Sequence, residues 1–256
     1  MNDTHTHPVV SSEQWTSERK ALLEREKELM RLHDAVARER RALPWVRIDK
    51  HYVFDTPQGK RALADLFEGR RQLMVQHFMF TPGKEQGCRS CSYMADHTDG
   101  ALPHQAQRDL AFVAVSRAPV EDIERFRRRM GWQFNWVSSG SGDFNYDFDV
   151  SFTPEQTAKG NVYYNFTMQP FPLPDAPGIS VFYKDGDGHI YRTYSTYGRG
   201  VEVMMHTYAL LDLTPKGRQE EGQADTMSWV RHHDLYDPAP AHAPAAASAA
   251  CCHAAA

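Results

Sequence analysis

The sequence predicts an α/β domain, built as a three-layer sandwich, with a helical extension before it and a long aromatic-rich insertion within it. Two patterns carry this prediction. Apolar strand-like segments alternate with helical segments between residues 71 and 139, and a hairpin followed by one more helix closes the domain near residue 213. Hydrophobic residues make up 41% of the 256 residues, which is enough to fill a sizeable core.

Residues 11–40 have the pattern of one amphipathic helix. Ser11 and Gln14 have the spacing of a capping box, and Pro44 marks the end of the helix. An apolar stripe recurs every seven residues, with a second beside it: Trp15, Leu22, Leu29 and Val36, then Leu23, Met30 and Ala37. This stripe either joins a partner, as in a homo-oligomeric coiled coil, or packs on the chain's own core. Residues 1–43 are therefore predicted to be an extension.

The predicted domain covers residues 44–236 and begins with short, alternating elements. In order these are a strand at residues 45–54, a turn and short helix at 56–67, a buried strand at 71–80, a helix beginning near Ser90, a strand at 108–116, a helix opened by Pro119 and a strand at 133–139. Strands that alternate with helices in this way are expected to be parallel and joined by right-handed crossovers.

The second half of the domain opens with residues 140–178, rich in Gly, Asn, Asp and Pro and in aromatic side chains. We interpret this segment as an insertion that covers the core, because its aromatic residues favour burial. Residues 178–197 predict a hairpin around an Asp-Gly turn, and residues 201–213 a closing helix. The order β-α-β-α-β-β-α is the thioredoxin-like layout. Residues 237–256 form a Pro/Ala-rich tail, predicted to be unordered, that carries Cys251 and Cys252.

Charge and hydropathy exclude some classes of partner. The net charge of −4 argues against nucleic-acid binding, and the basic run at residues 125–129 is interpreted as the solvated face of a helix. No apolar run reaches the roughly 18 residues of a membrane span, and the first residues lack the layout of a secretory signal. The predicted location is therefore the cytoplasm.

The sequence EQGCRSCSYMADH, residues 85–97, places Cys88 and Cys91 three positions apart, directly after a predicted core strand. Thiol–disulfide exchange needs one thiol that ionises easily and a second that resolves the mixed disulfide. A helix beginning near Ser90 would stabilise a Cys88 thiolate through its unpaired N–H groups, and Arg89 would add positive charge. These features predict Cys88 as the nucleophile and Cys91 as the resolving thiol, although metal binding and an inert pair also fit the spacing.

A metal site is the main alternative. Cys88, Cys91, His97 and His104 are ligands of the type that zinc or copper takes, and they would make the protein a metal-binding or interaction module. His97 alone has two other interpretations, as a proton acceptor for a cysteine or as a residue of the helix surface. No organic cofactor is expected, because neither G-x-G-x-x-G after a strand nor G-x4-G-K-[ST] is present.

Several segments together resemble a known family. They include LPWVRIDKHYVFDTPQGKRALADLFEGRRQL, HFMF, GCRSCSYMADH, VSRAPVEDI, RMGWQFNWVSS, DFNYDFDVSF, SVFYKDGDGHIYRTYSTYGRG and LDLTPKGRQE. In this order they are similar to the thioredoxin-like family catalogued as domain of unknown function 899, whose members are labelled predicted dithiol-disulfide oxidoreductases. The resemblance covers roughly residues 12–236 and implies a thioredoxin-like fold with Cys88 and Cys91 at the redox position. Ordinary thioredoxins have a cis-proline immediately before the strand that faces the dithiol. The sequence departs from them here, because the nearest candidate, Pro177, lies one residue early, and SVFYKDGDG looks more like the corresponding strand and turn of peroxiredoxin-like proteins.

Three polar residues are candidates for a substrate pocket. Arg117, Asn145 and Arg199 lie at predicted strand or loop ends, where an arginine can hold a carboxylate or a glutathione-like peptide. They also fit a structural role, in which they tie the aromatic-rich insertion to the core. Trp132 and Trp136 are expected in the core. The predicted function is therefore a thiol–disulfide oxidoreductase that acts on a protein or a low-molecular-weight thiol or disulfide.

Overall fold

The computed structural model describes residues 7–237, so the predicted tail from residue 238 onward, with Cys251 and Cys252, lies outside the described residues. The helices are α1 (Ser12–Arg41), α2 (Arg89–Asp96), α3 (Leu102–Ala106), α4 (Val120–Met130), α5 (Phe144–Asp147), α6 (Pro154–Ala158) and α7 (His206–Leu211). The strands are β1 (Val46–Arg47), β2 (Val53–Thr56), β3 (Gly59–Ala62), β4 (Gln72–His77), β5 (Leu110–Ser116), β6 (Asn135–Ser138), β7 (Val162–Tyr164), β8 (Thr167–Gln169), β9 (Gly178–Lys184) and β10 (Ile190–Tyr197). Short 3-10 helices include η1 (Leu63–Phe67), η3 (Gly198–Met204) and η4 (His233–Leu235).

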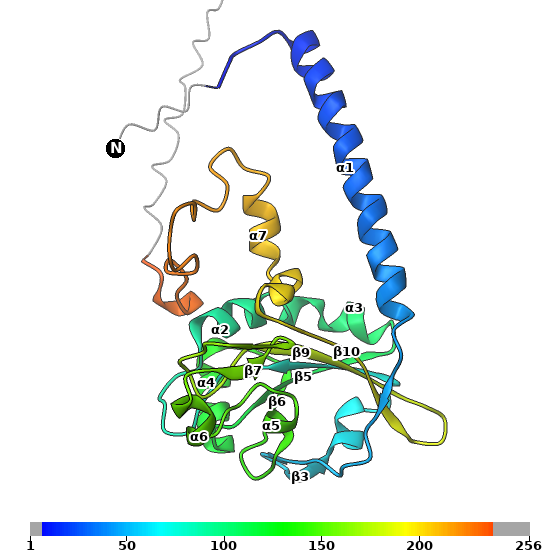
Figure 1. Cartoon of the computed structure of the whole chain (residues 1–256), viewed down its shortest axis with the longest axis vertical. Coiled ribbons are helices and arrows are strands. Elements are labelled where there is room, and N and C mark those ends of the chain that lie inside the picture. Colours follow the sequence, from blue (N-terminus) through cyan, green and yellow to red (C-terminus); the bar gives the residue numbers. More distant parts are fainter. Residues whose placement is uncertain (1–6, 238–256) are drawn as a thin grey trace, which may run out of the picture.

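Helix α1 projects away from the rest of the molecule (Figure 1). Ser11 caps it by accepting a hydrogen bond from the Gln14 N–H at 3.2 Å, whereas the Gln14 side chain bonds to Glu18 instead of completing the box. No residue of the helix is buried, and Trp15 is 60% exposed. The alternative that the apolar stripe packs on the chain's own core is therefore wrong. Pairing of the stripe with a second copy stays a prediction.

The central sheet has eight strands in the order β1-β10-β9-β4-β5-β6-β2-β3. Strands β4, β5 and β6 are parallel, as the alternation of strands and helices predicted. Strand β9 pairs antiparallel with β4 and with β10, which confirms the predicted hairpin. A central strand that leads into a helix, with a parallel neighbour on one side and an antiparallel hairpin on the other, is the thioredoxin-like arrangement. The cysteine motif follows that central strand.

Three predicted elements differ in the structure. The segment before β4 forms the β2–β3 hairpin and then η1, because Gly59 adopts a φ of +106° and the Thr56 hydroxyl donates to the Gly59 carbonyl at 2.7 Å, which reverses the chain. The predicted strand at residues 45–54 is split into β1 and the start of β2. The closing helix is also split, into η3 and α7, at Met205, whose φ of −105° and ψ of 69° are not helical.

Both faces of the sheet are covered. On one face, Phe112, Ala114 and Trp136 belong to a core cluster with residues of α2 and α4, and Trp132 and Trp136 are buried as predicted. On the other face, Phe144 and Phe148 of the insertion join a cluster with Phe54 and Phe182. Sheet, helices and aromatic insertion thus form three layers. Among residues 7–237, no helix has the length and apolarity needed to cross a membrane.

Candidate active site

The two cysteines lie where the chain passes from β4 into α2. Cys88 is the N-cap residue of α2, and its N–H donates to the Met79 carbonyl at 2.9 Å, which holds the returning loop against the end of the strand. Gln76 of β4 donates from Nε2 to the Cys91 carbonyl at 3.0 Å. The position of Cys88 at the start of a helix therefore agrees with the one expected from the sequence, and one hydrogen bond to the backbone of each cysteine holds the motif.

Two residues that the sequence reasoning did not single out shape the loop before Cys88. Gly87 packs so closely that an added Cβ would lie 2.6 Å from Phe78 Cε1 and 3.0 Å from Phe126 Cε1. Its carbonyl accepts a hydrogen bond from Nε2 of the buried His232 at 3.0 Å. A side chain at position 87 would push this loop away from its neighbours, so the placement of Cys88 depends on glycine here.

Cys88 and Cys91 are free thiols with opposite environments. Cys91 is 2% exposed, whereas Cys88 is only partly buried. The hydrogen bond from the Cys91 side chain lowers the pKa of Cys88 to about 6, assisted by the Cys91 and Ser90 N–H groups and the Ser90 side chain, although burial acts in the opposite direction. The same interaction with Cys88, together with burial and the charge of Cys88, raises the pKa of Cys91 well above its usual value. One thiol is thus prepared to ionise and the other to remain protonated.

We expect iodoacetamide to alkylate Cys88 at a rate that rises to half its maximum near pH 6. Thiolate is the reactive species, and a pKa of about 6 leaves about nine-tenths of Cys88 ionised at pH 7. Trypsin cuts after Lys84 and Arg89, so Cys88 falls in residues 85–89 and Cys91 in residues 90–108, and mass spectrometry reads each separately. Cys91 serves as the internal control and should stay unmodified over the same range. A midpoint for Cys88 near pH 8.5 would contradict the assignment.

Arg89, His97 and His104 do not have the contacts that the sequence suggested. The Arg89 guanidinium lies 2.9 Å from Asp225, so its charge is directed to that carboxylate. His97 donates from Nδ1 to the Tyr93 carbonyl at 2.6 Å, and its Nε2 accepts from the Thr207 N–H at 3.1 Å, which leaves neither nitrogen for a cysteine. His104 is an exposed residue of α3.

The Cys/His metal set is therefore not assembled. Within residues 7–237, the one group of three or more His, Cys, Asp or Glu side chains close enough to hold an ion is Asp185, Asp187 and His189, in the turn between β9 and β10. Asp185 Oδ1 already accepts hydrogen bonds from the N–H groups of Asp187 and His189 at 3.0 and 2.9 Å. The four residues proposed from sequence spacing do not form a metal site, because His97 faces α7 and His104 lies on another helix.

Arg117 and Asn145 take the structural role that the sequence left open. Arg117 donates from Nε to Asp175 Oδ1 at 2.7 Å and from a terminal nitrogen to the Tyr146 hydroxyl at 3.0 Å. Asn145 is buried and accepts from the Ser139 hydroxyl at 2.8 Å. Both residues tie the insertion to the sheet. Arg199 differs, because it lines the same cavity as the dithiol, where it pairs with Glu202 at 2.8 Å.

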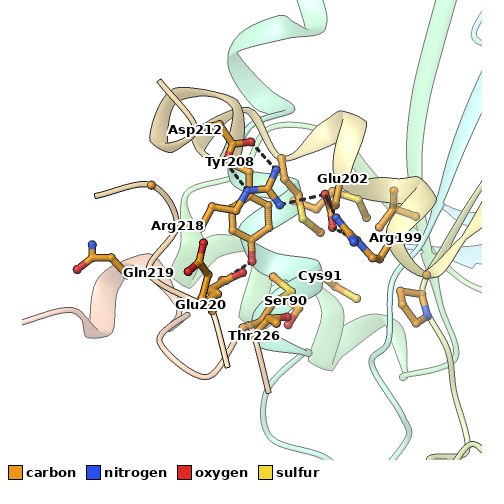
Figure 2. Close-up of a pocket in the computed structure, with 18 of the residues that line it drawn as sticks. Ser90, Cys91, Arg199, Glu202, Tyr208, Asp212, Arg218, Gln219, Glu220 and Thr226 are labelled. Atoms are coloured by element: carbon orange, nitrogen blue, oxygen red, sulfur yellow. Dashed lines mark hydrogen bonds and ion pairs between the residues drawn. The ribbon is translucent and has the colours of Figure 1, made fainter. Parts of the chain in front are cut away.

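A large cavity opens beside the dithiol (Figure 2). Its volume is about 1290 Å³, and both Cys88 and Cys91 line it. The opposite wall comes from η3, α7 and the segment that follows, with Arg218 bound to Asp212 at 2.7 Å and to Glu202 at 3.1 Å. Pro177 also lines the cavity, but no peptide bond of the described residues is cis, so this candidate is not a cis-proline.

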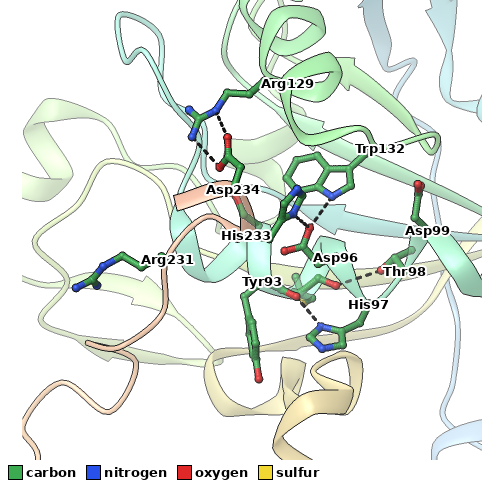
Figure 3. Close-up of polar contacts among 12 residues, drawn as sticks. Tyr93, Asp96, His97, Thr98, Asp99, Arg129, Trp132, Arg231, His233 and Asp234 are labelled. Atoms are coloured by element: carbon green, nitrogen blue, oxygen red, sulfur yellow. Dashed lines mark hydrogen bonds and ion pairs between the residues drawn. The ribbon is translucent and has the colours of Figure 1, made fainter. Parts of the chain in front are cut away.

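The segment after α7 packs onto α2 and α4 and completes this side of the molecule (Figure 3). Asp96 at the end of α2 accepts hydrogen bonds at 2.7 Å from Trp132 Nε1 and from His233 Nδ1. Arg129 of α4 forms two bonds to Asp234, at 2.7 and 2.9 Å. Periodicity in the sequence does not predict this irregular segment, whose contacts with Asp96 and Arg129 join residues more than a hundred positions apart.

The chain was also compared with known proteins and families. Similar solved structures include PrxQ from Xylella fastidiosa (14% identity, TM-score 0.39, covering 62% of this chain and 88% of that chain) and the peroxidoxin BcpB from Mycobacterium tuberculosis (13%, 0.41, 64% and 95%). Another is a putative thiol:disulfide interchange protein DsbE from Chlorobium tepidum (10%, 0.39, 66% and 97%). No curated protein matches the sequence.

One family model matches residues 4–236, which is nearly the whole chain. The match includes the helical extension, both cysteines of the motif, the aromatic insertion and the segment that packs onto α2. This is the family that the sequence motifs resembled. The protein accordingly belongs to the family described as bacterial protein of unknown function, DUF899.

Proposed function

We propose that the protein is a thiol–disulfide oxidoreductase in which Cys88 is the nucleophile and Cys91 the resolving thiol. The observation that carries the proposal is the opposite shift of the two pKa values, down to about 6 for Cys88 and upward for Cys91, at the start of the helix that follows the central strand. A nucleophilic cysteine must be ionised near neutral pH. A resolving cysteine must stay protonated until the mixed disulfide has formed. The pair has this division of roles before any substrate binds.

The proposed reaction reduces a substrate disulfide by two electrons. The Cys88 thiolate attacks one sulfur, the substrate S–S bond breaks, and the second substrate sulfur leaves as a thiolate that takes up a proton. Cys88 loses its negative charge in this step, so one cause of the raised pKa of Cys91 disappears. Cys91 then gives up its proton, attacks Cys88 Sγ and releases the other half of the substrate. The products are a substrate dithiol and a Cys88–Cys91 disulfide, which an external dithiol must reduce.

The proposal keeps the cytoplasmic location expected from the sequence, because a reducing compartment maintains Cys88 and Cys91 as thiols. It favours exchange over metal binding, since both nitrogens of His97 already have partners. The reaction uses only sulfur chemistry, and the residues needed for it are Cys88, Cys91 and the groups that hold them.

A redox titration tests the proposal. Protein with Cys251→Ser and Cys252→Ser is equilibrated in glutathione buffers, quenched by alkylation and digested with trypsin. A linked pair of peptides, residues 85–89 and 90–108, reports the Cys88–Cys91 disulfide. We expect a reversible two-electron transition between about −270 and −120 mV, the range of exchange catalysts. If the linked peptides form at no potential, the proposed function is wrong.

A further inference from the structure

We infer that the substrate disulfide belongs to a polypeptide segment with apolar side chains, and that glutathione disulfide is a poor substrate. This inference rests on the proposed function and names its substrate class. It comes from the size, the lining and the charges of the cavity that Cys88 and Cys91 share.

The size of the cavity favours a polypeptide. Sites for single small molecules usually measure about 300 to 1,000 Å³. The cavity beside the dithiol is larger, at about 1290 Å³. It extends from Cys88 at the start of α2 to Met227 in the segment after α7, so it has room for several residues on either side of a disulfide that reacts with Cys88.

Methionine side chains on both sides of the cavity make its lining apolar and adaptable. Four methionines, from segments far apart in the sequence, line the cavity: Met79, Met94, Met205 and Met227. Unbranched thioether side chains change rotamer easily and fit varied apolar partners, which is why methionine-rich surfaces bind diverse peptides. A cystine flanked by apolar side chains would bury those side chains against the methionines while it presents its sulfur to Cys88.

The charges of the wall disfavour an anionic small disulfide. Recognition of the glutathione carboxylates needs cationic groups, for which arginine is the usual choice. Here Arg199 binds Glu202, and Arg218 binds Asp212 and Glu202. Among the described residues that line the cavity, carboxylates outnumber Lys and Arg by four to three. Glutathione disulfide would therefore have to break existing ion pairs and enter a wall of net negative charge.

The test compares three disulfides in single-turnover reactions with reduced protein that carries Cys251→Ser and Cys252→Ser. The first is a nine-residue peptide with an internal disulfide flanked by Leu and Phe. The second is the same peptide with Ser at those positions, and the third is glutathione disulfide. The linked peptides 85–89 and 90–108 report the reaction. We expect the second-order rate constant for the apolar peptide to exceed each of the other two by about tenfold, as burial of one or two apolar side chains predicts.

Substitutions of methionines that line the cavity test the inference in a second way. Met227→Gln, and independently Met205→Gln, should reduce the preference for the apolar over the Ser peptide several-fold, and Met227→Leu should retain it. Met168→Gln is the matched control, because Met168 on β8 is 63% exposed and does not line the cavity. This control variant should keep the full preference.

Two negative outcomes are distinguishable. If the Ser peptide or glutathione disulfide reacts as fast as the apolar peptide while the Cys88–Cys91 disulfide still forms, the inference is wrong and the proposed function stands. If none of the three substrates, nor oxidised dithiothreitol, produces that disulfide, both the inference and the proposed function are wrong.

Discussion

Cys88→Ser is expected to lower thiol–disulfide exchange by at least about 10³-fold, because a serine hydroxyl remains protonated at neutral pH and cannot replace the thiolate nucleophile. The pKa of Cys88 is about 6, so most molecules carry the reactive thiolate at pH 7. Turnover of a peptide disulfide with dithiothreitol as the reductant measures the effect. The Cys251→Ser/Cys252→Ser background removes the contribution of the tail cysteines from both proteins.

Variants of Cys91 distinguish its two proposed roles, as the resolving thiol and as the hydrogen-bond donor to Cys88. Cys91→Ser should retain the first attack but accumulate a mixed disulfide between Cys88 and the substrate, visible as a mass increase. Cys91→Ala should in addition slow the alkylation of Cys88 at pH 7 several-fold, because the largest cause of the lowered Cys88 pKa is the hydrogen bond from the Cys91 side chain. A serine hydroxyl can still donate this bond, so Cys91→Ser should slow alkylation less than Cys91→Ala.

Arg89→Gln is the matched control for these variants. Arg89 follows Cys88 directly, but its guanidinium binds Asp225 at 2.9 Å. We expect its removal to change the alkylation of Cys88 little. Two results would contradict the assignment of roles: full exchange activity in Cys88→Ser, or equal alkylation rates of Cys88 in the parent, Cys91→Ala and Cys91→Ser proteins.

The sequence was sufficient to predict the position of the dithiol. Apolar strands that alternate with helices leave few topologies, and a Cys-x-x-Cys motif directly after the first buried strand must begin the next helix. The parallel strands β4, β5 and β6, the β9–β10 hairpin and the N-cap position of Cys88 all agree with this reasoning. These features depend on local periodicity and on chain order, both of which one sequence contains.

The partners of the polar side chains could not be predicted in the same way. Arg89 and His97 were expected to serve the cysteines because they are near them in sequence, yet their partners are Asp225, Thr207 and a backbone carbonyl. His232 and Gln76, which do hold the motif, lie 145 and 15 positions from their partners in it. A polar side chain finds its partner through the tertiary fold, and no local pattern encodes that choice.

Asp175→Ala is expected to lower the free energy of unfolding by about 3 to 5 kcal/mol, the largest stability effect among the variants proposed. This is the usual cost of removing one partner of a buried ion pair. The Asp175 side chain is 4% exposed and accepts from Arg117 at 2.7 Å and from the Ser151 hydroxyl at 2.6 Å. Its second oxygen accepts a hydrogen bond from Thr81, in the loop that leads to the cysteines. The substitution would leave the Arg117 charge unpaired. Urea denaturation followed by tryptophan fluorescence measures the change.

Two further variants test this explanation. Arg117→Met/Asp175→Leu should recover much of the loss, because a buried ion pair can be replaced by apolar side chains at little cost, whereas one unpaired charge cannot remain buried cheaply. Asp143→Asn is the surface control. Its carboxylate is 69% exposed and pairs with Lys50, so we expect a change of less than about 1 kcal/mol. If Asp175→Ala and the double variant lose equal amounts of unfolding free energy, the loss comes instead from the hydrogen bonds that Ser151 and Thr81 donate to Asp175. Thr81 lies in the loop before Cys88, so this network also links the aromatic insertion to that loop.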